Sequence, residues 1–157
     1  MAERRDEDWV DGADEPEDGL PSGEVYDWYQ RGVQLLEEGD PATASQVLGR
    51  AAARVPHSRS VLEALARAQF DSEQYDQAVG SFQRLVEVDP DDDYAQFGWG
   101  LSAAKLGQFD LAVEHLAVAA AMRPDVNYYA LALRGARATA RAQASSAHRR
   151  EEAAKKA

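Results

Sequence analysis

The sequence contains no cysteine, which excludes disulfides, thiolate metal sites and thiol nucleophiles. No apolar run approaches the ~20 residues that a membrane-spanning helix requires. The charged first residues also lack the apolar stretch of a secretion signal. At 157 residues, with 45% hydrophobic residues, the chain is expected to form one folded domain, located in the cytoplasm and without contact with a membrane.

Basic residues are scarce: 17 Lys and Arg stand against 28 Asp and Glu, which gives a formal net charge of −11. The charge is unevenly spread, at −7 over residues 1–23, −9 over residues 24–133 and +5 over residues 134–157. An acidic body repels phosphate backbones, so we expect no binding to nucleic acid. The abundance of Ala, and of Arg over Lys, suggests a bacterial origin.

What the sequence does contain is an internal repeat of 34 residues. Three prolines, three alanines and three large apolar residues recur at this interval: Pro56, Pro90 and Pro124; Ala44, Ala78 and Ala112; Leu48, Phe82 and Leu116. Such self-similarity at a fixed period is typical of solenoid proteins.

The spacing of Ala, large apolar residue and Pro resembles the tetratricopeptide repeat. The resemblance covers residues 25–58, 59–92 and 93–126. It implies an all-α fold, a right-handed superhelix of three helical hairpins with a C-terminal capping helix. Gln69, Gln96 and Ala103 depart from the pattern, because the family has aromatic side chains there.

The apolar residues recur at three- and four-residue steps, which predicts helices rather than strands. The predicted helices are 24–38, 41–54, 58–71, 75–88, 92–106 and 109–122, followed by a capping helix over 126–142. Residues 1–23 are predicted to be an acidic disordered tail. Residues 143–157 are predicted to be either a charged helical extension or a disordered tail.

Turn residues support these boundaries. Gly39 is expected to take the positive φ that ends a helix, and Asp40 to cap the next one. After each repeat-ending proline comes another candidate cap: Ser58, Asp91 or Asp92, and Asp125.

We find no sequence motif for catalysis or metal binding. His57, His115 and His148 have no second ligand at a metal-binding spacing, so we interpret each as an ordinary polar position. We therefore predict no cofactor, no metal and no enzymatic activity.

The aspartates of residues 89–93 resemble part of a calcium loop. However, Tyr94 and Gly100 stand where such a loop requires Gly and Glu. We interpret this segment as a helix-capping turn instead.

The family resemblance implies that the first helix of each hairpin lines the concave binding face. The predicted peptide-binding groove consists of Tyr26, Tyr29, Val33, Glu63, Arg67, Phe70, Tyr94, Phe97, Leu101 and Tyr128. On the same stripe lie Leu36, Ser60, Ala64, Gly98 and Leu131. Trp28, Phe82 and Trp99 are predicted to be core, and Gly98 either leaves space for a ligand or reflects tight packing.

Some members of the family bind a C-terminal carboxylate through Lys, Arg and Asn on these helices. This sequence has Tyr29, Val33, Ala64, Tyr94 and Gly98 at the corresponding positions, so we do not expect that clamp. A partly apolar protein or peptide segment of unknown identity is the expected partner.

Three functions remain open from the sequence. The first is a protein–protein interaction module, an adaptor or scaffold. The second is a small cytoplasmic chaperone for secretion or assembly of a client, and the third a self-associating structural protein. We expect a monomer, with weak self-association as the alternative. Trp9 in the acidic tail is a docking motif, a segment that folds back on the chain, or part of a solubility tail.

Overall fold

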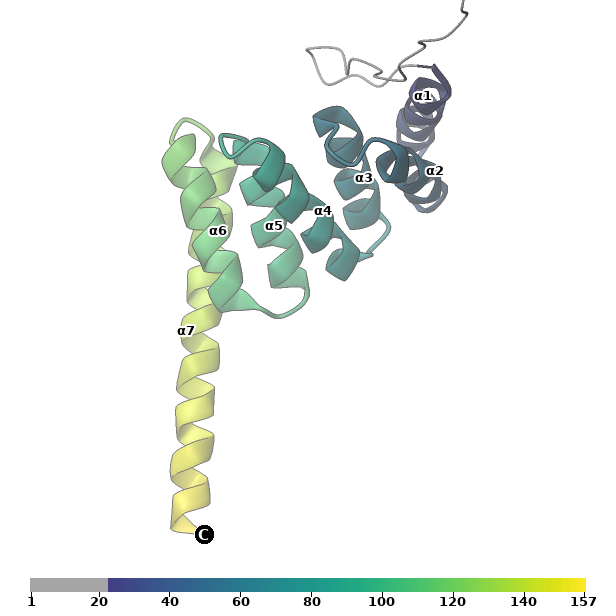
Figure 1. Cartoon of the computed structure of the whole chain (residues 1–157). Helices are drawn as coiled ribbons and strands as arrows, with labels where there is room; N and C mark the ends of the chain where they lie inside the picture. The colour runs from purple at the N-terminus through teal and green to yellow at the C-terminus, as the bar shows by residue number, and fades with distance from the viewer. Residues whose placement is uncertain (1–22) are drawn as a thin grey trace, which may run out of the picture.

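The computed structural model describes residues 23–157 as seven helices in series (Figure 1). They are α1 (Gly23–Glu37), α2 (Pro41–Arg54), α3 (Arg59–Asp71), α4 (Tyr75–Val88), α5 (Asp93–Lys105), α6 (Phe109–Met122) and α7 (Asn127–Lys156). The part of the chain described contains no strand, and the all-α prediction is confirmed. The first six helices end within one residue of the predicted boundaries. The predicted acidic tail and its Trp9 lie in residues 1–22, outside the described residues.

The last helix is longer than the predicted capping helix. It runs unbroken from Asn127 to Lys156, so residues 143–156 continue it. Leu133 and Ala136 are buried where α7 packs against α6. Beyond that contact, the C-terminal half of α7 projects past the ends of α5 and α6, and residues 147–157 are all exposed (Figure 1).

The helices pack as a solenoid. Each one contacts the next along the chain, and α1, α3, α5 and α7 also contact one another in that order. The periodic residues of the sequence form the buried interior: Ala44, Ala78, Ala112, Leu48, Phe82 and Leu116 are each at most 1% exposed. Burial of these apolar side chains, at roughly 25 cal/mol per Å², stabilises the stack.

Gly98 shows how closely successive hairpins approach. A Cβ added to Gly98 would overlap the ring of Phe82 on the preceding helix. The tight packing that was one of the two interpretations is therefore present, and Gly98 also lines a hollow described below. The residues one period away, Ala64 and Ala132, belong to clusters that contain the smaller Leu48 and Leu116.

Two glutamines that depart from the family pattern are buried and have polar partners. Gln69 Oε1 accepts a hydrogen bond from Ser81 Oγ at 2.6 Å. Gln96 Oε1 lies 2.9 Å from His115 Nδ1. Ser81 and His115 are one repeat apart, so the same position of the second helix is polar in both hairpins. A buried amide is tolerated here because its partner restores the hydrogen bond lost from water.

His115 is not the ordinary polar position that the sequence suggested. It is buried, and its ring stacks on Trp99 with the centroids 3.6 Å apart. His57 and His148 are exposed, and His148 lies 3.3 Å from Glu152.

Most predicted caps are present. Asp40 Oδ1 accepts from the Thr43 amide at 3.1 Å. Ser58 Oγ accepts from the amide of Val61 at 3.5 Å, and Asp92 Oδ1 from that of Ala95 at 3.0 Å.

The fourth predicted cap is wrong. The Asp125 carboxylate accepts hydrogen bonds from Arg123 at 2.9 and 2.8 Å, and Val126 precedes α7 without a side-chain cap. The guanidinium so close by offers Asp125 a stronger, charge-assisted partner than a backbone amide.

The turns inside the hairpins share one backbone conformation. Gly39 and Gly107 have φ of +80° and +78° at equivalent positions. Between them, Glu73 adopts φ +62°, a conformation that is uncommon outside glycine.

Candidate functional site

Two adjoining hollows lie along the first helices of the hairpins. The first, of about 240 Å³, lies between α1 and α3 and is lined by Tyr29, Val33, Leu36, Glu37, Ser60, Glu63, Ala64 and Arg67. The second, of about 170 Å³, involves α3, α4 and α5 and is lined by Arg67, Phe70, Asp71, Phe82, Tyr94, Phe97, Gly98 and Leu101. Arg67 lines both, so the hollows are neighbours, and we call them together the groove.

Most of the predicted groove residues line one of these hollows. The first contains Tyr29, Val33, Glu63 and Arg67, and the second adds Phe70, Tyr94, Phe97 and Leu101. Tyr26 and Tyr128 line neither. The Tyr26 hydroxyl accepts a hydrogen bond from Gln30 Nε2 at 2.5 Å. Tyr128 is 56% exposed and packs edge-on against Phe97, beyond the second hollow.

Sequence reasoning missed three lining residues. Glu37 and Asp71 are acidic residues in the last turns of α1 and α3, and Asp71 lies one turn after Arg67, a spacing that suggests an ion pair. Phe82 was assigned to the core only. It is 1% exposed, but its ring also forms part of the second hollow.

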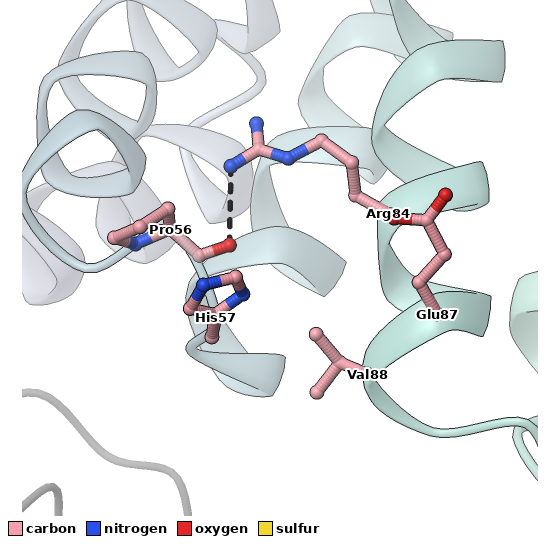
Figure 2. A pocket seen from close by; sticks show the side chains of 5 residues that line it. All are labelled: Pro56, His57, Arg84, Glu87 and Val88. Atoms are coloured by element: carbon pink, nitrogen blue, oxygen red, sulfur yellow. Dashed lines mark hydrogen bonds between the residues drawn. The ribbon is translucent and has the colours of Figure 1, made fainter.

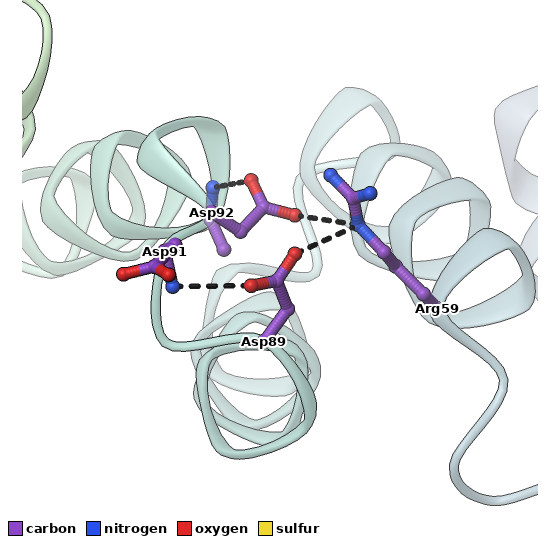
Figure 3. A network of polar contacts seen from close by, with 5 residues as sticks. Arg59, Asp89, Asp91 and Asp92 are labelled. Atoms are coloured by element: carbon purple, nitrogen blue, oxygen red, sulfur yellow. Dashed lines mark hydrogen bonds and ion pairs between the residues drawn. The ribbon is translucent and has the colours of Figure 1, made fainter.

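Glu63 is the central charge of the first hollow. Within residues 23–157, no hydrogen bond or ion pair reaches its carboxylate, although arginines stand one turn away on each side. Arg59 is instead held by Asp89 and Asp92, with Nε 3.4 and 3.3 Å from their Oδ2 atoms (Figure 3). Arg67 lies 3.7 Å from Asp71.

The surroundings of Glu63 disfavour its charged form. Burial, and then the nearby negative charge of Asp92, raises the pKa of the Glu63 carboxyl, whereas Arg59 and Arg67 lower it by less. Burial and the charge of Glu63 likewise raise the pKa of Tyr29. The first hollow therefore combines a neutral tyrosine with an unneutralised carboxylate.

The second hollow is mainly apolar and aromatic. Its rings are fixed by edge-on contacts: Phe70 on Tyr75, with centroids 5.3 Å apart, and Phe82 on Tyr94, at 6.0 Å. Phe97 packs against Tyr129 at 4.6 Å. Such contacts hold the wall rigid, and rigid aromatic surfaces bind partners with a small loss of conformational entropy.

Tyr129, which the sequence did not single out, packs against Phe97 without lining either hollow. It is 2% exposed, and its hydroxyl donates to Asp93 Oδ2 at 2.6 Å. Tyr129 lies one repeat after the buried Ala95, whereas Tyr128 lies one repeat after Tyr94, and only Tyr129 points inward. Burial, and then the Asp93 carboxylate, raises the pKa of Tyr129, which stays neutral.

A larger hollow of about 520 Å³ lies elsewhere, between the α2–α3 turn and the last turns of α4 (Figure 2). It is lined by Pro56, His57, Arg84, Glu87 and Val88. Arg84 Nη2 already donates to the Pro56 carbonyl oxygen at 3.1 Å. The aromatic rings that line the groove are absent from this lining, so size alone does not make it the better site.

The aspartates near residue 90 are engaged in the turn and in the cap of α5. Asp89 Oδ1 accepts from the Asp91 amide at 3.1 Å, while Asp92 caps α5 (Figure 3). Across the described part of the chain, no three His, Asp or Glu residues are grouped as metal ligands. None of the described helices has the length and apolar character to span a bilayer.

The profile of the tetratricopeptide-repeat family matches residues 35–97. No curated protein matches the chain. Among solved structures, MamA (residues 41 to the end) from Desulfovibrio magneticus RS-1 is similar with a TM-score of 0.72 and 20% identity, over 82% of this chain and 72% of that one. Two further MamA structures are covered over 66% of their length, slightly less than two thirds.

Two shorter proteins are covered almost completely. The type III secretion translocator chaperone SycD of Yersinia enterocolitica is similar with a TM-score of 0.67 and 14% identity, over 75% of this chain and 95% of that one. The first TPR domain of human RPAP3 is similar with a TM-score of 0.70 and 14% identity, over 78% and 96%. At these identities the likeness concerns the fold.

Proposed function

Because the chain belongs to the tetratricopeptide-repeat family, we propose that it is a non-enzymatic protein–protein interaction module, an adaptor or scaffold that holds a partner segment in the groove. One observation carries the proposal. Large aromatic and aliphatic side chains of α3 and α5 line a hollow next to one that contains an unneutralised carboxylate. These side chains are partly buried against the core, and a bound segment would cover the apolar surface that packing leaves open to the hollow. The location that we propose is the cytoplasm, on the sequence grounds given above.

The test is peptide capture by the full chain. Random linear peptides displayed on phage are panned on the immobilised protein, and the enriched peptides are measured by fluorescence anisotropy. We expect the double variant Tyr29→Ala, Phe97→Ala to abolish binding, because it removes one ring from each hollow.

The control is the pair Tyr26→Ala, Leu131→Ala, which also removes a tyrosine and an apolar side chain but outside the two hollows. Phe97 also contacts Tyr129, so the helical circular dichroism and melting of both variants must be recorded. If the groove variant is folded and still binds, or if the control loses binding equally, the groove is not the binding face.

A chaperone for a client protein is the second candidate. SycD, a chaperone by its name, is matched over 95% of its length. Co-expression with the partner distinguishes the two functions, since a chaperone would keep an otherwise insoluble client in solution and an adaptor would not.

Self-association is the third candidate. The SycD structure is described as a dimer, and Tyr128 and Leu131 are large apolar residues exposed on α7. Light scattering during size-exclusion chromatography tests it: a constant monomer mass with increasing concentration would contradict this function.

A further inference from the structure

Building on the proposed function, we infer that the groove recognises a segment with one cationic side chain and, about three residues away, one large apolar side chain. The Lys or Arg would lie in the first hollow beside Glu63. The aliphatic or aromatic side chain would lie in the second hollow, against Phe97 and Leu101.

Charge complementarity is the first argument. The first hollow contains Glu37 and Glu63 as its acidic groups and Arg67 as its only lining base. Arg67 is already drawn to Asp71, and Arg59 to Asp89 and Asp92 (Figure 3). The Glu63 carboxylate is thus left facing the groove with no ion-pair partner among the described residues. A cationic ligand group would supply the missing charge.

The neighbouring rings are the second argument. Tyr29 and Tyr94 are both close enough to Glu63 for its charge to raise their pKa values, after the effect of burial. Aromatic faces attract cations, by about 0.5–1 kcal/mol at exposed sites and more where water is excluded. Two tyrosines around one carboxylate favour Lys or Arg over any neutral side chain.

The second hollow differs in chemistry. Its charged groups, Arg67 and Asp71, are paired with each other, and its remaining lining is aromatic, aliphatic or glycine. Burying a cation there would leave it without a counterion, which is costly. A large apolar side chain fits this wall and gains from its burial.

The distance between the hollows sets the ligand spacing. The first hollow lies between α1 and α3, and the second lies between α3 and α5. Because packed helices are roughly 8–10 Å apart, the two hollows are separated by about that distance. A segment in the polyproline II conformation rises about 3.1 Å per residue and returns every third side chain to the same side. A separation of about three residues therefore places one side chain in each hollow.

Two segments of the chain itself are less suited to the groove than a partner chain. Residues 1–23 contain Arg5 four residues before Trp9, but their net charge of −7 opposes binding beside Glu63. Residues 134–157 carry +5, but they contain no large apolar residue to fill the second hollow. A partner chain, rather than either end of this chain, is the occupant that the charges favour.

The experiment is the same phage selection, repeated with wild type and three single variants of the full chain. We expect wild type to enrich Lys or Arg about three positions from Leu, Ile, Met, Phe or Trp. Glu63→Gln should lose the cationic preference and keep the apolar one. Leu101→Ala should do the reverse. Glu87→Gln, in the separate hollow beside Pro56 and Arg84, is the matched charge control and should select the wild-type motif.

A double-mutant cycle with one selected peptide gives the magnitude. Glu63→Gln, or replacement of the peptide's Lys by norleucine, should each weaken binding about fivefold, as expected for an ion pair of about 1 kcal/mol. Combining them should cause little further loss. A synthetic peptide of residues 134–157 should bind far more weakly, and its binding equally well would overturn the two-part motif.

The outcomes separate this inference from the proposed function. If peptides are enriched and depend on Phe97 but show no cationic preference, or if Glu63→Gln leaves their affinity unchanged, only the inference is wrong. If no peptide is enriched at all, both are contradicted.

Discussion

The buried faces of α1, α3 and α5 repeat from one hairpin to the next, whereas their groove faces do not. On the buried side, a Cβ added to Gly32 would overlap Leu48. Two repeats later, a Cβ added to Gly100 would overlap Leu116 in the same way. On the groove side, the same helices present Tyr29 in the first hairpin and Glu63 in the second. Packing between hairpins thus needs the same shapes at each step, while recognition of a ligand needs different groups at each step.

One interface departs from the regular buried pattern. Phe82 is larger than Leu48 and Leu116 at the equivalent positions, and Gly98 accommodates its ring. The largest effect on stability is expected for a substitution at this interface between Phe82 and Gly98. Gly98→Ala should lower the free energy of unfolding by about 1–3 kcal/mol, because overpacking outweighs the helix propensity that Ala gains. Chemical denaturation monitored by circular dichroism measures it.

Two further variants make this prediction specific. Phe82→Leu in the Gly98→Ala background should recover part of the loss, as a double-mutant cycle will show. Gly80→Ala, in a helix and with nothing within 4 Å of its added Cβ, should instead stabilise the protein by about 0.5–1 kcal/mol. If Gly98→Ala is as stable as Gly80→Ala, the interface is looser than described.

The second prediction concerns His115, whose imidazole is buried against Trp99. Burial lowers its pKa, and Glu114 opposes the effect more weakly. Because the folded-state pKa lies below the unfolded value, the unfolded chain takes up the proton more readily. The protein is therefore not destabilised by His115 above about pH 6.5, where the ring is neutral in both states. It loses stability as the pH falls from there through the lowered pKa of the folded state.

Thermal melts from pH 7.5 to pH 5 measure this loss. We expect the melting temperature of wild type to fall by a few degrees more than that of His115→Gln, which cannot titrate at this position. His57→Gln is the control, because His57 is exposed. An equal pH dependence in wild type and His115→Gln would contradict the assignment.

The same comparison explains what could be predicted from sequence. The 34-residue period marks the buried face, and it predicted the first six helices to within one residue. The period carries no information about pairing between unlike residues. Gln69 and Gln96 were recognised only as departures from the pattern, because their partners Ser81 and His115 lie on another helix.

The groove was predictable only in part, for a related reason. Helical phase brought most of the proposed lining residues onto one face, since position in the repeat decides which way a side chain points. The period also places Tyr129 in register with Val61 and Ala95, which are both buried, so a signal for its inward orientation was present in the sequence. Helical phase also could not show that Glu63 has no ion-pair partner among the described residues. Arg59 pairs instead with Asp89 and Asp92, which lie in the connection between α4 and α5.

The smallest expected effect is on the groove side, at Glu63. Its pKa is raised in the folded state above the unfolded value, chiefly by burial. Ionised Glu63 therefore weakens folding. Its contribution to stability is most favourable below the unfolded pKa and is lost as the pH rises through the folded one. At neutral pH, above the unfolded pKa, ionised Glu63 opposes folding, and because its side chain is exposed the effect is screened, so Glu63→Gln should raise the melting temperature only slightly.

The pH dependence of this gain identifies its cause. The difference between Glu63→Gln and wild type should vanish at pH 4, where the wild-type carboxyl is protonated, and Glu87→Gln should show no gain at pH 7. A lower melting temperature for Glu63→Gln would mean that the carboxylate makes a stabilising contact and is not free to meet a ligand. A gain in stability combined with a loss of cationic peptides would instead be the pattern of a residue whose charge serves binding at the expense of the fold.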